Sequence, residues 1–186
     1  MSSFKLLTVL NLWFIEINKL PSTVTNLRNL RADEMISKSL AKLEQMKSLE
    51  LFDVDASFAV KMSHLLKLQK LALSGRLARG KLPGWTCFLT SLKQVHLIAS
   101  GIAQDSLLLL SSLPGLLHLG LNAAYREKEM TFAAGSFPAL QTLTLLESSN
   151  LGQISRECLA ELHELVLDRC TKLADSPKGM ENLTRL

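Results

Sequence analysis

The sequence contains few aromatic residues: they make up 5% of its 186 residues, with a single tyrosine and two tryptophans. Hydrophobic residues nevertheless account for 47% of the chain, so aliphatic side chains, mainly leucine, must fill the core. Cysteine is also scarce. Cys87, Cys158 and Cys170 are odd in number, and their spacing matches neither a disulfide framework nor a zinc site. We expect all three to be packing residues in a reducing compartment.

Long uninterrupted hydrophobic segments are also absent. The most apolar stretch, residues 107–121, contains Ser111, Ser112, Pro114 and His118 and is too short to span a bilayer. The apolar residues 6–15 near the start lack the small-residue cleavage site of a signal peptide. The sequence therefore predicts a cytoplasmic protein without a transmembrane segment.

Catalytic and cofactor motifs are equally sparse. Residues 75–81 match the first seven positions of a phosphate-binding loop, but Leu82 stands where a magnesium-binding Ser or Thr is needed. His96 and His118 fall on adjacent predicted strands with their positions offset by two residues, and no third metal ligand is evident. No serine, histidine and acid form a nucleophile signature. We therefore expect no cofactor, no metal and no enzymatic activity.

Six stretches of the sequence repeat one pattern, LxxLxxLxL with conservative replacements. Their third positions are Leu49, Leu71, Val95, Leu119, Leu143 and Leu165, which are 22 to 24 residues apart. In the LxL part, alternate residues point the same way, as a strand requires. One repeat cannot bury its own leucines, so neighbouring repeats must stack and share a core.

This period predicts an α/β repeat fold: a leucine-rich-repeat solenoid, or horseshoe, with a parallel concave sheet and irregular or short helical convex segments. We expect a single array over residues 1–186, incomplete at both ends because neither end has a polar capping unit. Leu10 and Leu12 begin an earlier repeat. A degenerate unit with Asp33 and Met35 at strand positions is expected to follow it.

A solenoid of this kind is a binding surface, and its outward strand positions are the candidate partner-binding residues. They are expected on the concave face: Trp13, Phe14, Phe52, Asp53, Lys70, His96, His118, Asn122, Asp168 and Arg169. Exposed aromatic residues among them are candidate contact anchors. Trp13 and Phe14 could equally pack on a neighbouring repeat.

Negative charge is missing from one part of the sequence, since no acidic residue lies between Asp55 and Asp105. That part contains a second candidate partner-binding set, the basic patch: Lys61, Lys67, Arg76, Arg79, Lys81 and Lys93. These residues could form a solvated surface or dock an acidic protein domain. Nucleic acid is disfavoured because no aromatic residues interleave with the charges.

Several segments resemble the C-terminal repeats of plant disease-resistance proteins with a nucleotide-binding domain, leucine-rich repeats and an N-terminal coiled coil. They include the GRLxxxxLPxW unit of residues 75–85, the Ala124-Tyr125 step, residues 135–138 (GSFP) and residues 168–170 (DRC). The resemblance implies recognition of a pathogen effector or a guarded host protein, and restraint of the receptor's nucleotide-binding domain. No nucleotide site is carried over, because this sequence lacks that domain. The alternative is a scaffold or adaptor repeat protein in signalling.

Overall fold

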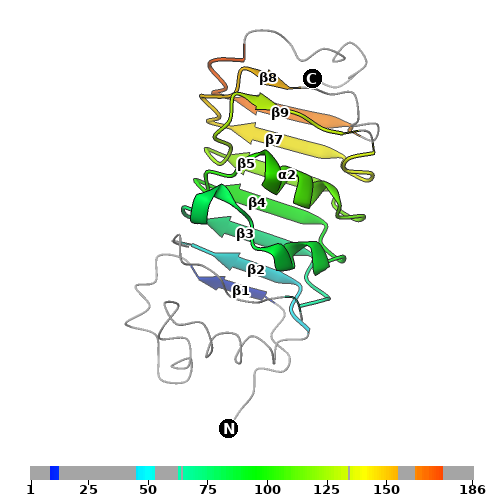
Figure 1. Ribbon diagram of the computed structural model, residues 1–186. Helices are drawn as coiled ribbons and strands as arrows, with labels where there is room; N and C mark the ends of the chain where they lie inside the picture. Colours follow the sequence, from blue (N-terminus) through cyan, green and yellow to red (C-terminus); the bar gives the residue numbers. More distant parts are fainter. Residues whose placement is uncertain are drawn as a thin grey trace.

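The computed structural model describes residues 9–12, 45–52, 63, 65–133, 135–154 and 162–173. Within them, seven strands form one parallel sheet in the order β1-β2-β3-β4-β5-β7-β9, so each repeat lies beside the previous one (Figure 1). The strands are β1 (Val9–Leu12), β2 (Ser48–Leu51), β3 (Lys70–Ser74), β4 (Gln94–Ile98), β5 (His118–Asn122), β7 (Thr142–Leu146) and β9 (Glu164–Asp168). A small parallel sheet pairs β6 (Glu129–Met130) with β8 (Gln153–Ile154).

The register of the large sheet follows the leucine spacing of the sequence. The third positions of the six repeats are Cα partners from β2 to β9: Leu49, Leu71, Val95, Leu119, Leu143 and Leu165. All six are buried. The leucines two residues later form a second column, which points to the same side of the sheet. The predicted repeat positions and the parallel sheet are therefore confirmed.

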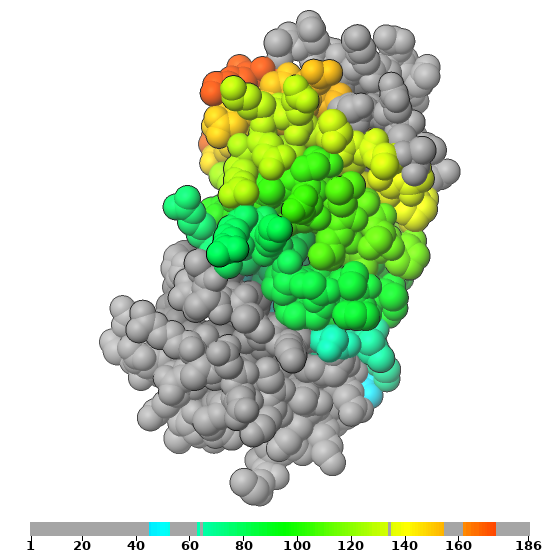
Figure 2. Space-filling model, in the orientation of Figure 1, coloured from blue at the N-terminus to red at the C-terminus, as the bar shows by residue number. Residues whose placement is uncertain are grey.

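The segments that return the chain from one strand to the next cover one face of the sheet. They include two short 3₁₀ helices, η3 (Ala78–Gly80) and η4 (Gly84–Phe88), and the helix α2 (Gln104–Ser111). Trp85 of η4 and Leu107 and Leu110 of α2 are buried against the strand leucines, so the core lies between these two layers. In Figure 2, the green residues of η4 and α2 form a continuous surface on this face of the molecule. These short helices match the predicted convex segments.

A left-handed residue follows each strand of the large sheet from β3 onward. Besides Gly75, these are Ala99, Ala123, Glu147 and Arg169, with φ between 47° and 54°. Such a conformation costs about 1–2 kcal/mol for a residue with a Cβ. Hydrogen bonding offsets part of this cost, because the N–H of Ala99 donates to Asn122 O at 2.9 Å and that of Ala123 to Leu146 O at 2.8 Å. The chain therefore leaves the sheet abruptly at its carboxyl edge, where the strands end.

One prediction lies outside the described residues and another needs correction. The unit predicted around Asp33 and Met35 falls on residues that are not described; among the described strands, β1 is hydrogen-bonded directly to β2. Cys87, predicted to be a packing residue, is exposed at the end of η4, and its thiol donates to Gly84 O at 3.0 Å. The thiol of Cys170 is free but packs partly against the core, as predicted. Cys158 lies outside the described residues.

Candidate interaction surface

The sheet face opposite α2, η3 and η4 is not covered by these segments, and we call it the open face. In β4 its residues Gln94, His96 and Ile98 are half-buried, whereas Val95 and Leu97 between them are buried. Strand register arranges the open-face residues in three rows: Lys70, Gln94, His118, Thr142 and Glu164; Glu50, Ala72, His96, Gly120, Thr144 and Val166; and Ser74, Ile98, Asn122, Leu146 and Asp168. This is the face predicted to be concave.

A charged pair occupies the open face at β2 and β3. Lys70 Nζ lies 2.6 Å from Glu50 Oε1, and the side chain of Glu50 is only 11% exposed against 38% for Lys70. A carboxylate that is largely removed from water needs a partner of opposite charge. Lys70 therefore stabilises the fold by neutralising Glu50, and only part of its charge is free to attract a ligand.

His96 lies beside this pair, at the centre of the open face. Its Cα partners on the adjacent strands are Ala72 and Gly120, two of the smallest side chains on the face. A Cβ on Gly120 would stand 2.6 Å from Nδ1 of His96, so the imidazole lies across the glycine backbone. Burial lowers the pKa of His96, and the positive charge of Lys70 lowers it further, against the opposing effect of Glu50. The neutral ring can both donate and accept a hydrogen bond.

His118 is the open-face residue diagonal to His96, because it pairs with Gln94 and not with His96. Its charge is a smaller cause of the lowered His96 pKa. In the described part of the chain, no three His, Cys, Asp or Glu residues come close enough together to hold a metal ion. The two histidines are thus neighbours that can offer hydrogen bonds to a common ligand.

Two large hydrophobic side chains lie on the open face at β7 and β9. Leu146 is half-buried and Val166 is 37% exposed, although both are large hydrophobic side chains. Thr142 Oγ1 lies 3.4 Å from Glu164 Oε2 in the row nearest the amino edge, where the strands begin. A partner that covers the open face would therefore meet a charged pair and imidazoles at β2 to β5, and a mixture of apolar, hydroxyl and carboxylate side chains at β7 and β9.

Asp168 ends β9, and Arg169 is the left-handed residue that follows it. Arg169 Nη1 lies 2.7 Å from Glu147 Oε1 of the preceding repeat, and its Nε lies 3.9 Å from Asp168 Oδ2. All three side chains are largely exposed. Arg169 is thus placed at the carboxyl edge, next to the open face, and both its acidic neighbours partly neutralise it.

The basic patch is divided between the two edges of the sheet. Lys67 and Lys93 precede β3 and β4 at the amino edge, and Lys67 Nζ donates to Gln45 Oε1 at 2.8 Å. Arg76, Arg79 and Lys81 follow β3, beyond the carboxyl edge. All five are exposed, but the length of a strand separates the two groups. Any one partner that contacts both groups must span the sheet.

The repeats seen in the structure match a known family. A family model described as a leucine-rich repeat region matches residues 30–186. The chain belongs to the leucine-rich-repeat family.

Relatives of this leucine-rich-repeat chain are plant disease resistance proteins. It is 29% identical to disease resistance protein RPM1 of Arabidopsis thaliana over 153 residues, which cover 80% of this chain and 16% of the relative. It is 28% identical to disease resistance protein RPP8 of the same plant over 162 residues, covering 82% of the chain and 18% of the relative. A probable RPP8-like protein 4 is 26% identical over 179 residues. The predicted resemblance is confirmed, and the chain spans less than a fifth of the length of the first two relatives.

Four of the predicted site residues of the leucine-rich-repeat chain, Trp13, Phe14, Asp53 and Lys61, lie outside the described residues. Phe52 is half-buried just after β2. Among the described helices, none has the length and apolar character needed to cross a membrane.

Sequence reasoning missed two features of this leucine-rich-repeat surface. It did not identify the ion pair between Glu50 and Lys70, although an acid at an outward strand position diagonal to Lys70 was a usable signal. It also omitted Arg126, an exposed residue after β5. Arg126 belongs to no sequence motif, and its surroundings depend on how the repeats stack.

Proposed function

We propose that this leucine-rich-repeat array is the recognition region of an intracellular plant immune receptor, and that its open face binds a pathogen effector or a guarded host protein. The observation that carries the proposal is the uncovered row of charged, hydrogen-bonding and apolar side chains in strict register, with His96 at its centre. The names of the relatives support the immune role.

The same region is proposed to restrain the nucleotide-binding domain of the receptor. The basic residues at both edges of the sheet are suited to contacts with an acidic domain surface, because they are exposed and most carry no described ion pair. Restraint would then be electrostatic and would weaken as ionic strength rises. Catalysis has no part in this proposal, and the cytoplasm is the proposed location.

The test of the open face uses the same substitution on both faces of the array. Val166 on the open face and Leu108 on α2 are exposed hydrophobic residues, at 37% and 48% exposure, and each is replaced by lysine. The two variants and the unchanged chain are expressed in plant cells, captured, and their partners identified by mass spectrometry. V166K should lose the effector or host partner, whereas L108K should retain it. Equal capture by both variants would contradict binding through the open face.

A second set of variants tests the proposed restraint. Lys67 and Lys93 are reversed together to glutamate in one variant, and Arg76 and Arg79 in another, so each edge of the sheet is tested separately. Lys70 is left unchanged because it neutralises Glu50. Capture of a nucleotide-binding receptor domain, lost on charge reversal at either edge, would support restraint.

The alternative function, a scaffold or adaptor in signalling, predicts a different result. Such a protein would capture signalling proteins without a nucleotide-binding receptor domain, and the charge reversals would leave that capture unchanged. This outcome would replace the immune-receptor proposal.

A further inference from the structure

Three consecutive repeats meet at one point beyond the carboxyl edge of the sheet. A Cβ built on Gly80, which follows β3, would lie 3.1 Å from Cζ and 3.2 Å from Nη1 of Arg126, which follows β5. The same Cβ would lie 2.3 Å from the carbonyl oxygen of Gly101, which follows β4. The guanidinium of Arg126 therefore reaches across the intervening repeat and rests against the backbone of Gly80.

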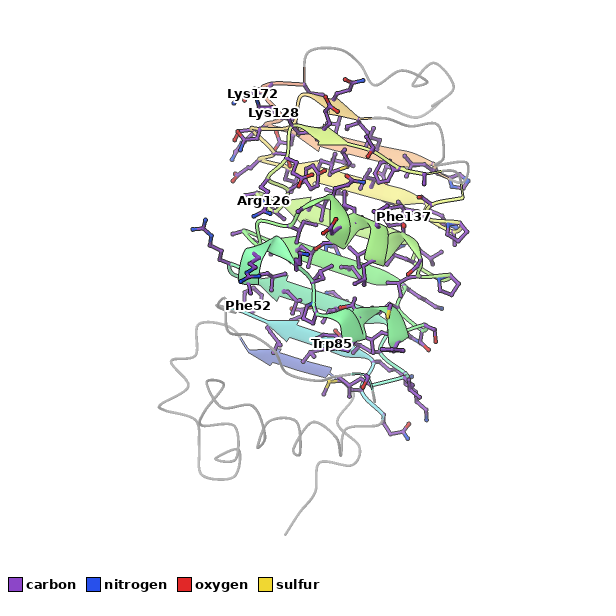
Figure 3. All side chains as sticks on the ribbon, in the orientation of Figure 1. Phe52, Trp85, Arg126, Lys128, Phe137 and Lys172 are labelled. Carbon is purple, nitrogen blue, oxygen red and sulfur yellow. The ribbon has the colours of Figure 1, made fainter. Side chains whose placement is uncertain are left out.

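This contact depends on the absence of side chains. Gly80 has a φ of 67° and Gly101 a φ of 62°, values in the left-handed region that favours glycine. The intervening repeat contributes small residues at the equivalent positions, Ala99 to Gly101, and no charge. As a result, the Arg126 guanidinium lies against Gly80, the residue that follows Arg79 in the chain. In Figure 3, Arg126 lies on the side of the sheet to which the strands point.

The positive charge at this point is not neutralised by the described residues. Neither Arg79 nor Arg126 forms an ion pair with an acidic residue among them, and both side chains are exposed. Lys81 is already paired, with Nζ 3.3 Å from Asp105 Oδ2. Glu127, the acid next to Arg126, instead accepts hydrogen bonds through Oε2 from the N–H of Gln104 at 3.3 Å and the hydroxyl of Tyr125 at 3.4 Å.

We propose that Arg79 and Arg126, on the platform of Gly80, bind a phosphate group carried by a flexible segment of a protein partner. Two guanidinium groups offer paired N–H donors that match the terminal oxygens of a phosphate, and their two positive charges balance its dianion. A carboxylate, with a single negative charge, would balance only one of the two guanidinium groups. The site does not rest on the function proposed for the open face.

The charges farther along the same edge favour a protein segment over a membrane surface. Beyond Arg126, the exposed carboxylates of Glu129, Glu147 and Asp168 stand among the positive charges of Lys128, Arg169 and Lys172. An anionic bilayer lying flat along the edge would meet both signs of charge and gain little net attraction beyond the two arginines, whereas a short segment contacts only the two arginines and their neighbours.

The test is an NMR titration of the ¹⁵N-labelled chain with a phosphoserine-containing peptide and its unphosphorylated counterpart at constant ionic strength. The phosphopeptide should shift the amide signals of Gly80, Gly101 and Arg126 in a saturable manner. R126Q should weaken its binding about 5- to 10-fold, and R126K should fall between, since lysine keeps the charge but not the paired donors. D105N, which releases Lys81 from its ion pair, should strengthen binding about 2-fold.

Two controls make the result decisive. K172Q removes a positive charge elsewhere on the same edge, where Lys172 Nζ lies 3.4 Å from Asn150 Oδ1, and should leave phosphopeptide affinity unchanged. Inorganic phosphate should shift the same signals with lower affinity than the phosphopeptide. The proposal is overturned by equal binding of both peptides, by equal loss in R126Q and K172Q, or by binding only to vesicles that contain a phosphoinositide.

Discussion

The imidazole of His96 lies over Gly120 of the adjacent strand, at a place where a methyl group would stand 2.6 Å from Nδ1. The missing side chain lets the ring rest on the sheet and removes part of it from water. Burial is in turn the largest cause of the lowered His96 pKa. One glycine thus shapes the open face at its centre and favours the neutral form of its central histidine.

Replacement of Gly120 by alanine should displace the His96 ring toward solvent. We expect the folded state to lose about 1 kcal/mol, a typical cost of a local overpacking that a side chain can relieve. The pKa of His96 should also rise toward its usual value as the ring regains water. NMR titration of the His96 ring protons in both proteins measures this. An unchanged pKa in G120A would show that the glycine does not control the burial of the ring.

The lowered pKa of His96 predicts a loss of stability in mild acid. Below about pH 6.5, the usual histidine pKa, the unfolded chain binds a proton at this residue that the folded chain still excludes. The free energy of unfolding should therefore fall as pH drops from 7.5 toward the lowered pKa. H96Q removes this contribution, so its stability should decline less over the same range in urea denaturation. Parallel curves for the two proteins would contradict the prediction.

Loss of Lys70 should destabilise the protein through Glu50. K70M leaves a carboxylate that is 11% exposed without its partner at 2.6 Å. Because Lys70 itself is 38% exposed, we expect a moderate cost of about 1–2 kcal/mol. Adding E50Q should recover most of it, since a neutral amide needs no counter-charge. K93M is the control, at an exposed lysine, and should change stability by less than about 0.5 kcal/mol. Equal effects of K70M and K93M would rule out the pair as a structural element.

Ser106 joins two repeats by a buried pair of hydrogen bonds. Its hydroxyl donates to Gly80 O at 2.9 Å and accepts from the N–H of Leu82 at 3.0 Å. S106A would leave the Leu82 N–H without this acceptor and should cost about 1–3 kcal/mol. The matched control is S112A just beyond α2, where the exposed hydroxyl donates only to Leu109 O at 2.7 Å. Thermal unfolding of both variants measures the difference, and a cost for S106A no greater than for S112A would contradict the assignment.

The same contact holds Gly80 in place beneath Arg126, so S106A should also weaken phosphopeptide binding.

Much of the fold could be predicted from the sequence, because leucine spacing acts locally. Alternate leucines in each LxL segment set which side chains enter the core, and the near-constant period sets the register, as for Leu71, Val95 and Leu119. The same alternation identified Lys70, His96, His118, Asn122 and Asp168 as outward residues, although their role in binding stays a prediction. The prediction that Cys87 is a packing residue was wrong. A return segment with irregular structure has no hydrophobic period from which burial could be predicted.

The sequence by itself determined the solenoid, its core columns and its family, since each follows from a pattern repeated along the chain. Only the tertiary structure decided which outward residues meet. It separated Lys67 and Lys93 from Arg76 and Arg79 by a strand length, buried Glu50 beside Lys70, and brought Arg126 onto Gly80. The physical reason is that these contacts join different repeats, so they depend on how backbone turns and missing side chains allow the stacked repeats to approach one another.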